Sequence, residues 1–220
     1  MSKHVRRRFH VGLAILCLLV VCATGTWLIW DQPVERDSAP VYPHAQAISP
    51  LVSKPESVPA RATCSTGDTF TPTWISIQGV TDHLPVLGVA RTLVDVSGVL
   101  PVTTTSKWQV GWDDASARPG SMQGNVLLTA HTWPSFDPAL GNQLLAKLNS
   151  GAKVILHGVN GQRACYQVTQ IVTKPVADYP SDAVYRTSGS PGLAITVCSG
   201  ERLGPGDWSD RTIWFAKAVK

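Results

Sequence analysis

The sequence predicts a mostly β domain, a barrel or a sandwich with one or two short helices, behind a transmembrane helix and a Pro-rich stalk. Three observations lead to this fold class. Eight short runs rich in β-branched residues follow one another between Phe70 and Lys220, separated by Gly, Pro, Asn and Asp. A single stretch among them has helical spacing of its leucines. An uncharged apolar segment and a proline-rich segment precede them all.

The N-terminus predicts export and a membrane anchor. Residues 11–30 carry no charge, and twenty residues at helical rise span a hydrocarbon core of roughly 30 Å. The basic head, residues 1–10, should stay cytoplasmic by the positive-inside rule. We therefore expect a single-pass cell-membrane protein whose folded domain is extracytoplasmic. A cleaved signal peptide is the alternative, because small residues stand at 23–25, but the length of the apolar stretch favours an anchor.

The prolines of residues 31–69 predict an extended linker, and residues 70–220 then form one folded domain. The formal net charge is +4, which equals the charge of the four basic residues Lys3 and Arg6 to Arg8 in the head. The rest of the chain is therefore almost neutral overall. Such a balance gives no support for nucleic-acid binding, which needs a clustered basic face.

The secondary-structure elements of the domain follow from its apolar patterns. Leucines at 140, 144, 145 and 148 have helical spacing and predict a helix over 138–149, with Gly151 just beyond its end. Asn160 and Gly161 predict the turn of a hairpin. Strands are expected at 73–78, 84–89, 108–112, 125–131, 153–159, 163–174, 193–198 and 212–219.

Three cysteines, Cys64, Cys165 and Cys198, lie outside the predicted membrane segment. An odd number in an extracytoplasmic protein implies that at least one thiol is free. A disulfide between Cys64 and Cys165 is possible, but its geometry does not follow from the sequence. All three could also be small buried residues, because free cysteine is among the most buried residue types.

Three side chains suited to acyl transfer occur at the ends of predicted strands. Cys198 closes the run LAITV, His131 closes NVLLTA and Arg211 opens TIWFA. A cysteine nucleophile needs its thiolate, and a histidine can protonate the leaving amine. A guanidinium offers several donors to an oxyanion. Each residue also has a structural alternative, and His83 and His157 compete with His131 for the role of base.

The region from Phe70 to Lys220 resembles the sortases, membrane-anchored cysteine transpeptidases of Gram-positive cell envelopes. The resemblance rests on four features: PG at 119–120 with GNVLLTAH at 124–131, the Leu-rich helix, ITVC at 195–198, and RTIWFA at 211–216. It implies a closed eight-stranded barrel in which Cys198 is the nucleophile, His131 the acid or base, and Arg211 the oxyanion or substrate anchor. It further implies cleavage of the Thr-Gly bond in an LPXTG-like C-terminal sorting signal of secreted proteins. A thioester on Cys198 would then pass to the amine of a peptidoglycan precursor, with no cofactor or metal.

The sequence departs from the sortase pattern at three places. Ala130 replaces a Gly that often precedes the histidine, and Val197 replaces a Thr that often precedes the cysteine. Cys198 and Arg211 are thirteen positions apart, which predicts a long loop at 199–210 and makes Arg202 a rival for the arginine role. The Trp-rich composition looks closest to actinobacterial single-domain sortases of class E/F type. Asp113 and Asp114 form an acidic pair that is weak evidence of a metal site.

Two other functions stay open at this stage. One is a different extracytoplasmic cysteine acyltransferase, such as an L,D-transpeptidase acting on peptidoglycan stems. That family places its cysteine in a Ser-His-Gly-Cys setting, which this sequence lacks. The other is an envelope-anchored binding module, not an enzyme, in which every cysteine is structural.

Overall fold

The computed structural model of the chain describes residue 64 and residues 67–91, 96–134 and 138–220. The predicted basic head, the membrane anchor at 11–30 and most of the linker at 31–69 lie outside these residues. Within the part described, no helix has both the length and the apolar character needed to span a membrane.

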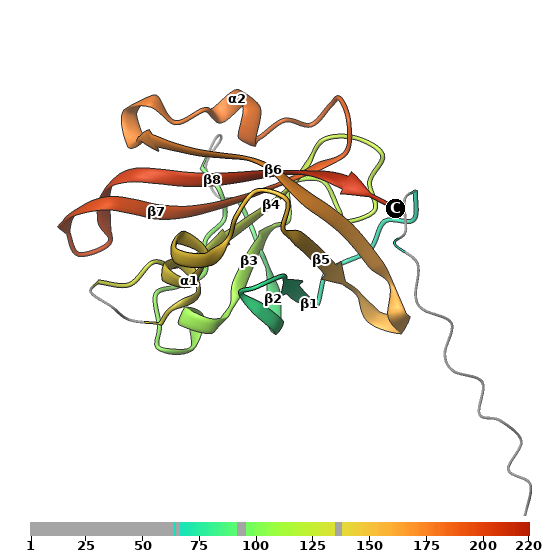
Figure 1. The fold of residues 1–220 in the computed structure, drawn as a ribbon, viewed down its shortest axis with the longest axis horizontal. Helices are drawn as coiled ribbons and strands as arrows, with labels where there is room; N and C mark the ends of the chain where they lie inside the picture. The colour runs from blue at the N-terminus through green and yellow to red at the C-terminus, as the bar shows by residue number, and fades with distance from the viewer. Residues whose placement is uncertain (1–63, 65–66, 92–95, 135–137) are drawn as a thin grey trace, which may run out of the picture. The chain divides into compact units, whose positions relative to one another are not determined.

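Eight strands form a closed barrel, as predicted (Figure 1). Their order around the barrel is β1-β2-β3-β4-β7-β8-β6-β5. The β2–β3 and β4–β7 pairs are parallel, and the remaining six are antiparallel. The strands are β1 (Trp74–Ile77), β2 (Thr81–Val89), β3 (Val110–Asp113), β4 (Asn125–Ala130), β5 (Lys153–His157), β6 (Arg163–Pro175), β7 (Gly192–Gly204) and β8 (Asp207–Val219).

The helices of the described part are short. The predicted helix is present as α1 (Leu140–Lys147), and α2 (Ser181–Val184) lies in the connection from β6 to β7. Three 3₁₀ turns, η1 (Thr105–Trp108), η2 (Val159–Gly161) and η3 (Val176–Asp178), complete the set. The predicted hairpin turn falls in η2, where Asn160 has φ 57° and Gly161 φ 77°, values that favour Asn and Gly.

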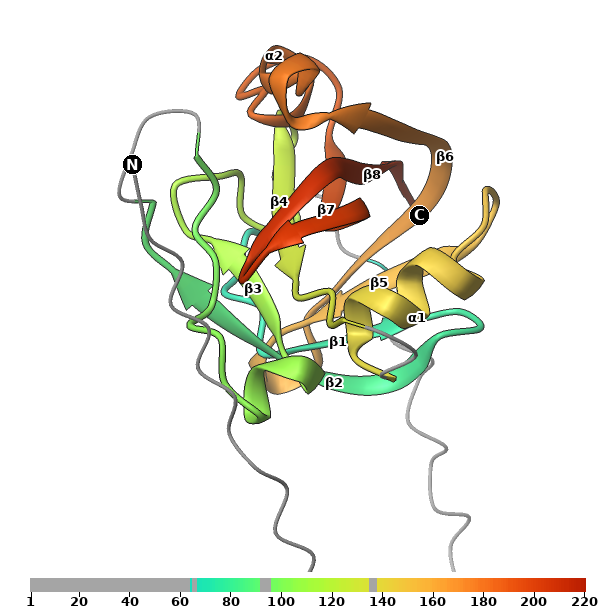
Figure 2. The ribbon, with the colours of Figure 1, turned by 90° about the vertical axis from the view of Figure 1, so that its left-hand side faces the viewer.

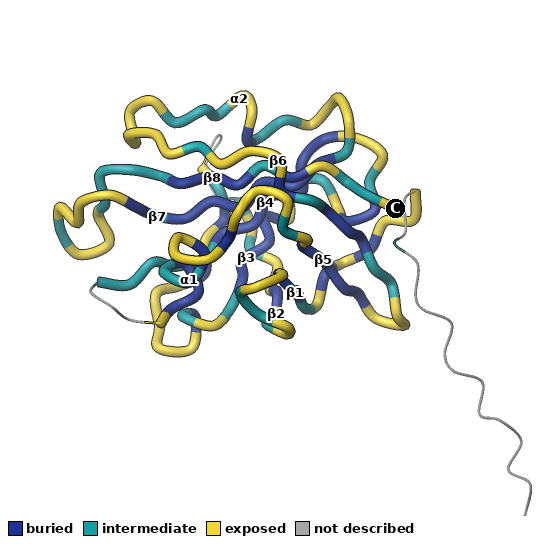
Figure 3. The backbone as a smooth tube through the Cα atoms, in the orientation of Figure 1, coloured by how far each residue is buried: buried dark blue, intermediate teal, exposed yellow. Residues whose placement is uncertain are grey.

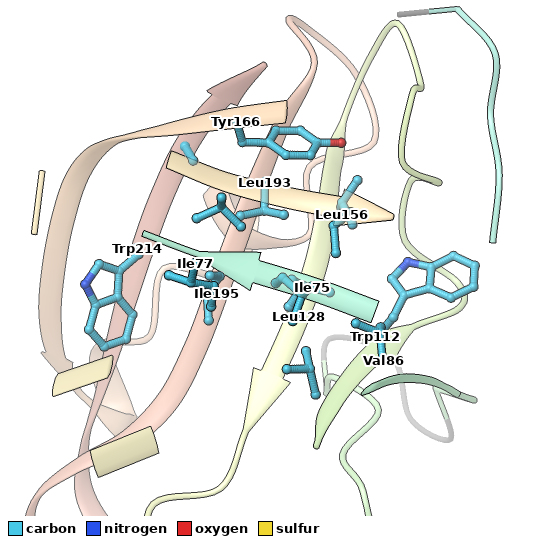
Figure 4. Packing of buried hydrophobic residues seen from close by; sticks show 14 of the residues in the cluster. Ile75, Ile77, Val86, Trp112, Leu128, Leu156, Tyr166, Leu193, Ile195 and Trp214 are labelled. Carbon is cyan, nitrogen blue, oxygen red and sulfur yellow. The ribbon is translucent and has the colours of Figure 1, made fainter. Parts of the chain in front are cut away.

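The barrel interior is an apolar core to which every strand contributes. Ile75, Leu128, Ile195 and Trp214 all point into it and are at most 2% exposed (Figure 4). Leu140 and Leu144 on one face of α1 belong to the same core. Together these buried side chains supply the hydrophobic free energy that holds the barrel closed.

Alternate residues of β4, β7 and β8 point to the outer face of the barrel wall instead. Leu127, Ala194 and Ile213 are fully buried there, with Val184 of α2, in a second and smaller cluster. Side chains alternate between the two faces of a strand, so every second residue counted from Leu127, Ala194 or Ile213 also faces outward. Those positions include His131 just beyond β4, Cys198 on β7 and Arg211 on β8.

The segment 199–210 is not the long loop that the sequence predicted. It forms the end of a hairpin, because β7 continues to Gly204 and β8 begins at Asp207. The hairpin projects beyond the barrel (Figure 1) and lies in front of it when that side faces the viewer (Figure 2), and its tip is largely exposed (Figure 3). Gly200, at φ 78°, accompanies a register shift in this ladder between Ser199 and Arg202.

A disulfide joins Cys64 to Cys165 on β6, with the two Cα atoms 5.5 Å apart. Cys198 is the free cysteine of the described residues. The prediction of at least one free thiol is therefore confirmed, and the pairing that the sequence left open is decided.

Candidate active site

Cys198 and Arg211 are directly opposite each other in the antiparallel ladder of β7 and β8. Opposite residues of such a pair share one face of the sheet, with their Cβ atoms about 4.5–5.5 Å apart. The twelve residues between them in sequence form the end of the hairpin. Both residues lie within long strands, not at strand ends as the sequence suggested.

His131 approaches Cys198 from the other side of β7. The parallel ladder between β4 and β7 ends with the pair Ala130–Val197, so His131 and Cys198 are the next residues of their chains. The apolar run of β4 therefore carries the histidine to the cysteine. The three predicted site residues thus come from three neighbouring strands, β4, β7 and β8.

A cavity of about 780 Å³ contains all three side chains in its wall. Its other walls are the segment 96–102, the segment 176–185 that contains η3 and α2, the residues after His131, and the hairpin tip. Many lining side chains are apolar, among them Val99, Val102 and Val176, and these three are 46–68% exposed. A partly apolar cavity with a few convergent polar groups is the usual form of a small-ligand or peptide site.

The imidazole of His131 is oriented by a backbone carbonyl. Its Nε2 lies 2.7 Å from the oxygen of Leu100. A carbonyl can only accept, so Nε2 carries the proton and Nδ1 is the nitrogen able to accept one. The segment that carries Leu100 thus fixes the tautomer of the histidine through this carbonyl.

A buried ion pair holds that segment in place. Asp113, with no exposed surface, accepts from Arg91 Nε at 2.9 Å and from the backbone N–H of Gly98 at 3.3 Å. The Gly98 carbonyl accepts from the hydroxyl of Thr129 at 3.1 Å. The acidic pair that weakly suggested a metal site is therefore structural at Asp113. Among the residues described, no group of three or more His, Cys, Asp or Glu could hold a metal ion.

The residues after His131 are tied to α1 and to β7. The N–H of Gly141 donates to the His131 carbonyl at 3.0 Å. The Asn142 amide accepts from the Trp133 N–H at 2.8 Å and donates to the Trp133 carbonyl at 3.0 Å. The Thr132 hydroxyl donates to the Cys198 carbonyl at 2.6 Å. None of these partners had a sequence signal, since each depends on tertiary contact.

Burial raises the pKa of the Cys198 thiol, the positive charge of Arg211 acts in the opposite direction, and Asp207 adds to the rise. Desolvation penalises the thiolate, so the neutral thiol is the favoured resting form. The thiolate then has to form with help from a base in the cavity. His131 lines the same cavity and is the candidate for that base.

The guanidinium of Arg211 is aimed by its own hairpin. Nη1 donates to the carbonyls of Trp208 at 3.2 Å and Asp210 at 2.8 Å. Nε and Nη2 are the donors of this side chain that the hairpin does not use. Arg202 also lines the cavity, but it pairs with Trp208 farther out on the hairpin and is exposed. The ladder favours Arg211 as the partner of Cys198.

The two competing histidines lie elsewhere on the barrel. The rings of His83 on β2 and His157 on β5 both stack against the ring of Trp74 on β1, which lies between those two strands. Their ring centroids are 4.5 and 3.2 Å from that of Trp74. Burial, Arg163 and then His83 lower the pKa of His157 to about 4. Neither histidine lines the cavity. His131 is therefore the better candidate for the acid or base.

Comparisons with known proteins agree with the fold. Residues 83–219 match the family model described as the sortase domain. The chain therefore belongs to the sortase family, a family of cysteine transpeptidases. A search of curated proteins gave no significant match.

Solved sortase structures share the fold. Sortase A from Corynebacterium diphtheriae superimposes with a TM-score of 0.50 at 18% identity, covering 70% of this chain and 62% of its own. Sortase C-1 from Actinomyces oris gives a TM-score of 0.50 at 19% identity, covering 69% and 76%. At these identities the likeness shows the fold alone, and the class E/F type stays a prediction.

Proposed function

We propose that the protein cleaves an LPXTG-like sorting signal at its Thr-Gly bond. It then transfers the substrate protein, which now ends in the threonine carbonyl, to a cell-wall amine. The observation that carries this proposal is the meeting of thiol, imidazole and guanidinium in one cavity, with Cys198 and Arg211 directly opposite in the ladder. Sortase family membership supports the reaction class.

The first half-reaction forms a thioester. His131 Nδ1 takes the proton of the Cys198 thiol, and Sγ attacks the carbonyl carbon of the substrate threonine. The oxyanion of the tetrahedral intermediate is stabilised by N–H groups of Arg211. The C–N bond then breaks, and the imidazolium of His131 gives its proton to the leaving glycine amine.

The second half-reaction uses the same groups in reverse. An amine of a peptidoglycan precursor attacks the thioester carbon and gives a proton to His131. The C–S bond breaks and the new amide leaves. The Cys198 thiolate finally recovers its proton from His131, so atoms and charges balance over the cycle.

The proposed location in the cell rests on the sequence of residues outside the described part. We propose that residues 11–30 anchor the protein in the cytoplasmic membrane and that the linker at 31–69 presents the domain to secreted substrates. This arrangement would place the enzyme where exported proteins and wall precursors meet.

The test is peptide cleavage by the full-length chain in detergent micelles. Quenched fluorescent peptides of LPXTG type are offered with and without an amine acceptor, and the acyl-enzyme is sought by mass spectrometry. Cys198→Ala should abolish cleavage, His131→Gln should remove nearly all of it, and Arg211→Lys should lower kcat/KM about 10²-fold.

Arg202→Ala is the matched control, because it removes the other guanidinium of the cavity. We expect it to stay within about three-fold of the parent, since its site is solvated. Full activity in Cys198→Ala, or loss of activity in Arg202→Ala while Arg211→Lys stays fully active, would contradict the assignment. Cross-linking of muropeptides without peptide cleavage would favour the L,D-transpeptidase alternative.

A further inference from the structure

One hydrogen bond joins the two sides of the cavity that carry the thiol and the imidazole. The Thr132 hydroxyl, next to His131, donates to the backbone carbonyl of Cys198 at 2.6 Å. We infer that Thr132 is a positioning residue that sets the placement of His131 relative to Cys198. This inference rests on the proposed function, in which these two side chains exchange a proton.

The place of this bond in the sheet explains why a side chain is needed. The parallel ladder of β4 and β7 runs from Asn125–Gly192 to Ala130–Val197 and ends there. After Ala130 the chain leaves the sheet and turns toward α1, which brings His131 into the cavity. Beyond the last ladder pair, the Thr132 hydroxyl donates to the Cys198 carbonyl of β7. This hydrogen bond connects the chain to β7 after β4 has ended.

Besides the contact of the His131 ring with the Leu100 carbonyl, the backbone of this segment is tied to α1. Gly141 holds the carbonyl of His131, and the Asn142 amide holds both backbone groups of Trp133. These bonds fix the histidine segment to the helix. The bond from Thr132 then fixes it to β7, the strand that carries the nucleophile. The Leu100 carbonyl orients the imidazole, and the Thr132 hydroxyl sets the distance of the histidine backbone from the strand of Cys198.

The chemistry is sensitive to that separation. Proton transfer needs heavy atoms about 2.6–3.2 Å apart, or bridged by one water. A misplacement of about 1 Å costs on the order of 10²-fold in rate. The Cys198 thiol is held neutral by burial, so it depends on a close base to form its thiolate.

The test compares Thr132→Val, which keeps the shape and removes the donor, with Thr132→Ser, which keeps the donor. In the full-length chain, Thr132→Val should lower kcat about 10- to 100-fold with KM within about two-fold, and Thr132→Ser should recover most of kcat. Thr132→Ala removes the hydroxyl without a branched side chain and serves if the valine variant does not fold.

Thr169→Val is the matched control. The Thr169 hydroxyl on β6 also donates to a strand carbonyl, that of Phe215 at 3.2 Å, but it is exposed and lies outside the cavity wall. We expect no change in its kcat. Parent-like kcat in Thr132→Val, or an equal loss in Thr132→Ser and Thr132→Val, would overturn the inference.

A second readout does not need a peptide substrate. Iodoacetamide alkylation of Cys198 is followed by mass spectrometry of its own peptide, because Cys17 and Cys22 also carry thiols. Thr132→Val should slow this alkylation near pH 7, and the difference should vanish at high pH, where the thiolate forms without a base. Equal rates at every pH would overturn the inference. Failure of the parent to cleave any sorting peptide would instead count against the proposed function and leave this comparison intact.

Discussion

Gly141 on α1 gives a prediction in which the usual effect of a substitution is reversed. Glycine inside a helix is about 1 kcal/mol less favourable than alanine, so Gly→Ala in a helix normally stabilises. Here an added Cβ would lie 2.5 Å from the His131 carbonyl oxygen, 2.7 Å from its carbon and 2.7 Å from the Thr132 hydroxyl. Two of these atoms are backbone and cannot rotate away.

The size of the effect follows from those distances. Ordinary non-bonded contacts begin near 3.5 Å, so helix and segment must separate by about 1 Å. Overpacking of this kind costs about 1–3 kcal/mol, which exceeds the gain in helix propensity. We expect Gly141→Ala to lower the free energy of unfolding by up to about 2 kcal/mol, the overpacking cost less the gain in helix propensity. It should also lower kcat about 10²-fold, because His131 moves with the segment.

Urea denaturation followed by circular dichroism, together with peptide cleavage, measures both effects. Gly88→Ala on β2 is the matched control, because its added Cβ would be 3.7 Å from the nearest atom, in Trp112. We expect that variant to change stability by less than about 0.5 kcal/mol. If Gly141→Ala stabilises the protein and keeps kcat, the proposed packing of α1 against the histidine segment is wrong.

Two further predictions concern charge and covalent structure. Asp207 raises the pKa of the Cys198 thiol, so Asp207→Asn should lower that pKa and speed iodoacetamide alkylation at pH 8. Because salt screens the charge, the difference between variant and parent should shrink in 1 M salt. Slower alkylation of the variant would contradict the expected direction. Replacing Cys64 and Cys165 by alanine removes a cross-link between residues 101 positions apart. Because the cross-link lowers the entropy of the unfolded chain, its loss should lower the free energy of unfolding by about 4–5 kcal/mol. Urea denaturation checks this value, and an unchanged midpoint would show that the bond adds no stability.

The fold and the chemical groups of the site were accessible from sequence because they leave local patterns. Apolar runs flanked by turn residues marked each strand, and the spacing of the leucines marked α1. His131, Cys198 and Arg211 were identifiable because each adjoins such a run. Their catalytic roles remain predictions, although the cavity brings all three together.

The hairpin was missed for a physical reason. Residues 199–210 are mostly polar or glycine and largely exposed, so they have no alternation to indicate a strand. Their ladder hydrogen bonds are a property of the assembled sheet. The same holds for the Leu100 carbonyl and the Thr132 hydroxyl, whose partners are 31 and 66 positions away in sequence.

The alternation along β4 and β7 places neighbouring residues of one strand in the barrel core and in the wall of the cavity. Leu128 and Ile195 face the core, whereas Thr129 and Thr196 on the same strands face the cavity. A change in peptide preference can therefore arise from outward positions while the barrel packing stays intact. For engineering, the outward positions that line the cavity, and not the buried outer cluster of Leu127, Ala194 and Ile213, are the places where new recognition can be selected with the least effect on the scaffold.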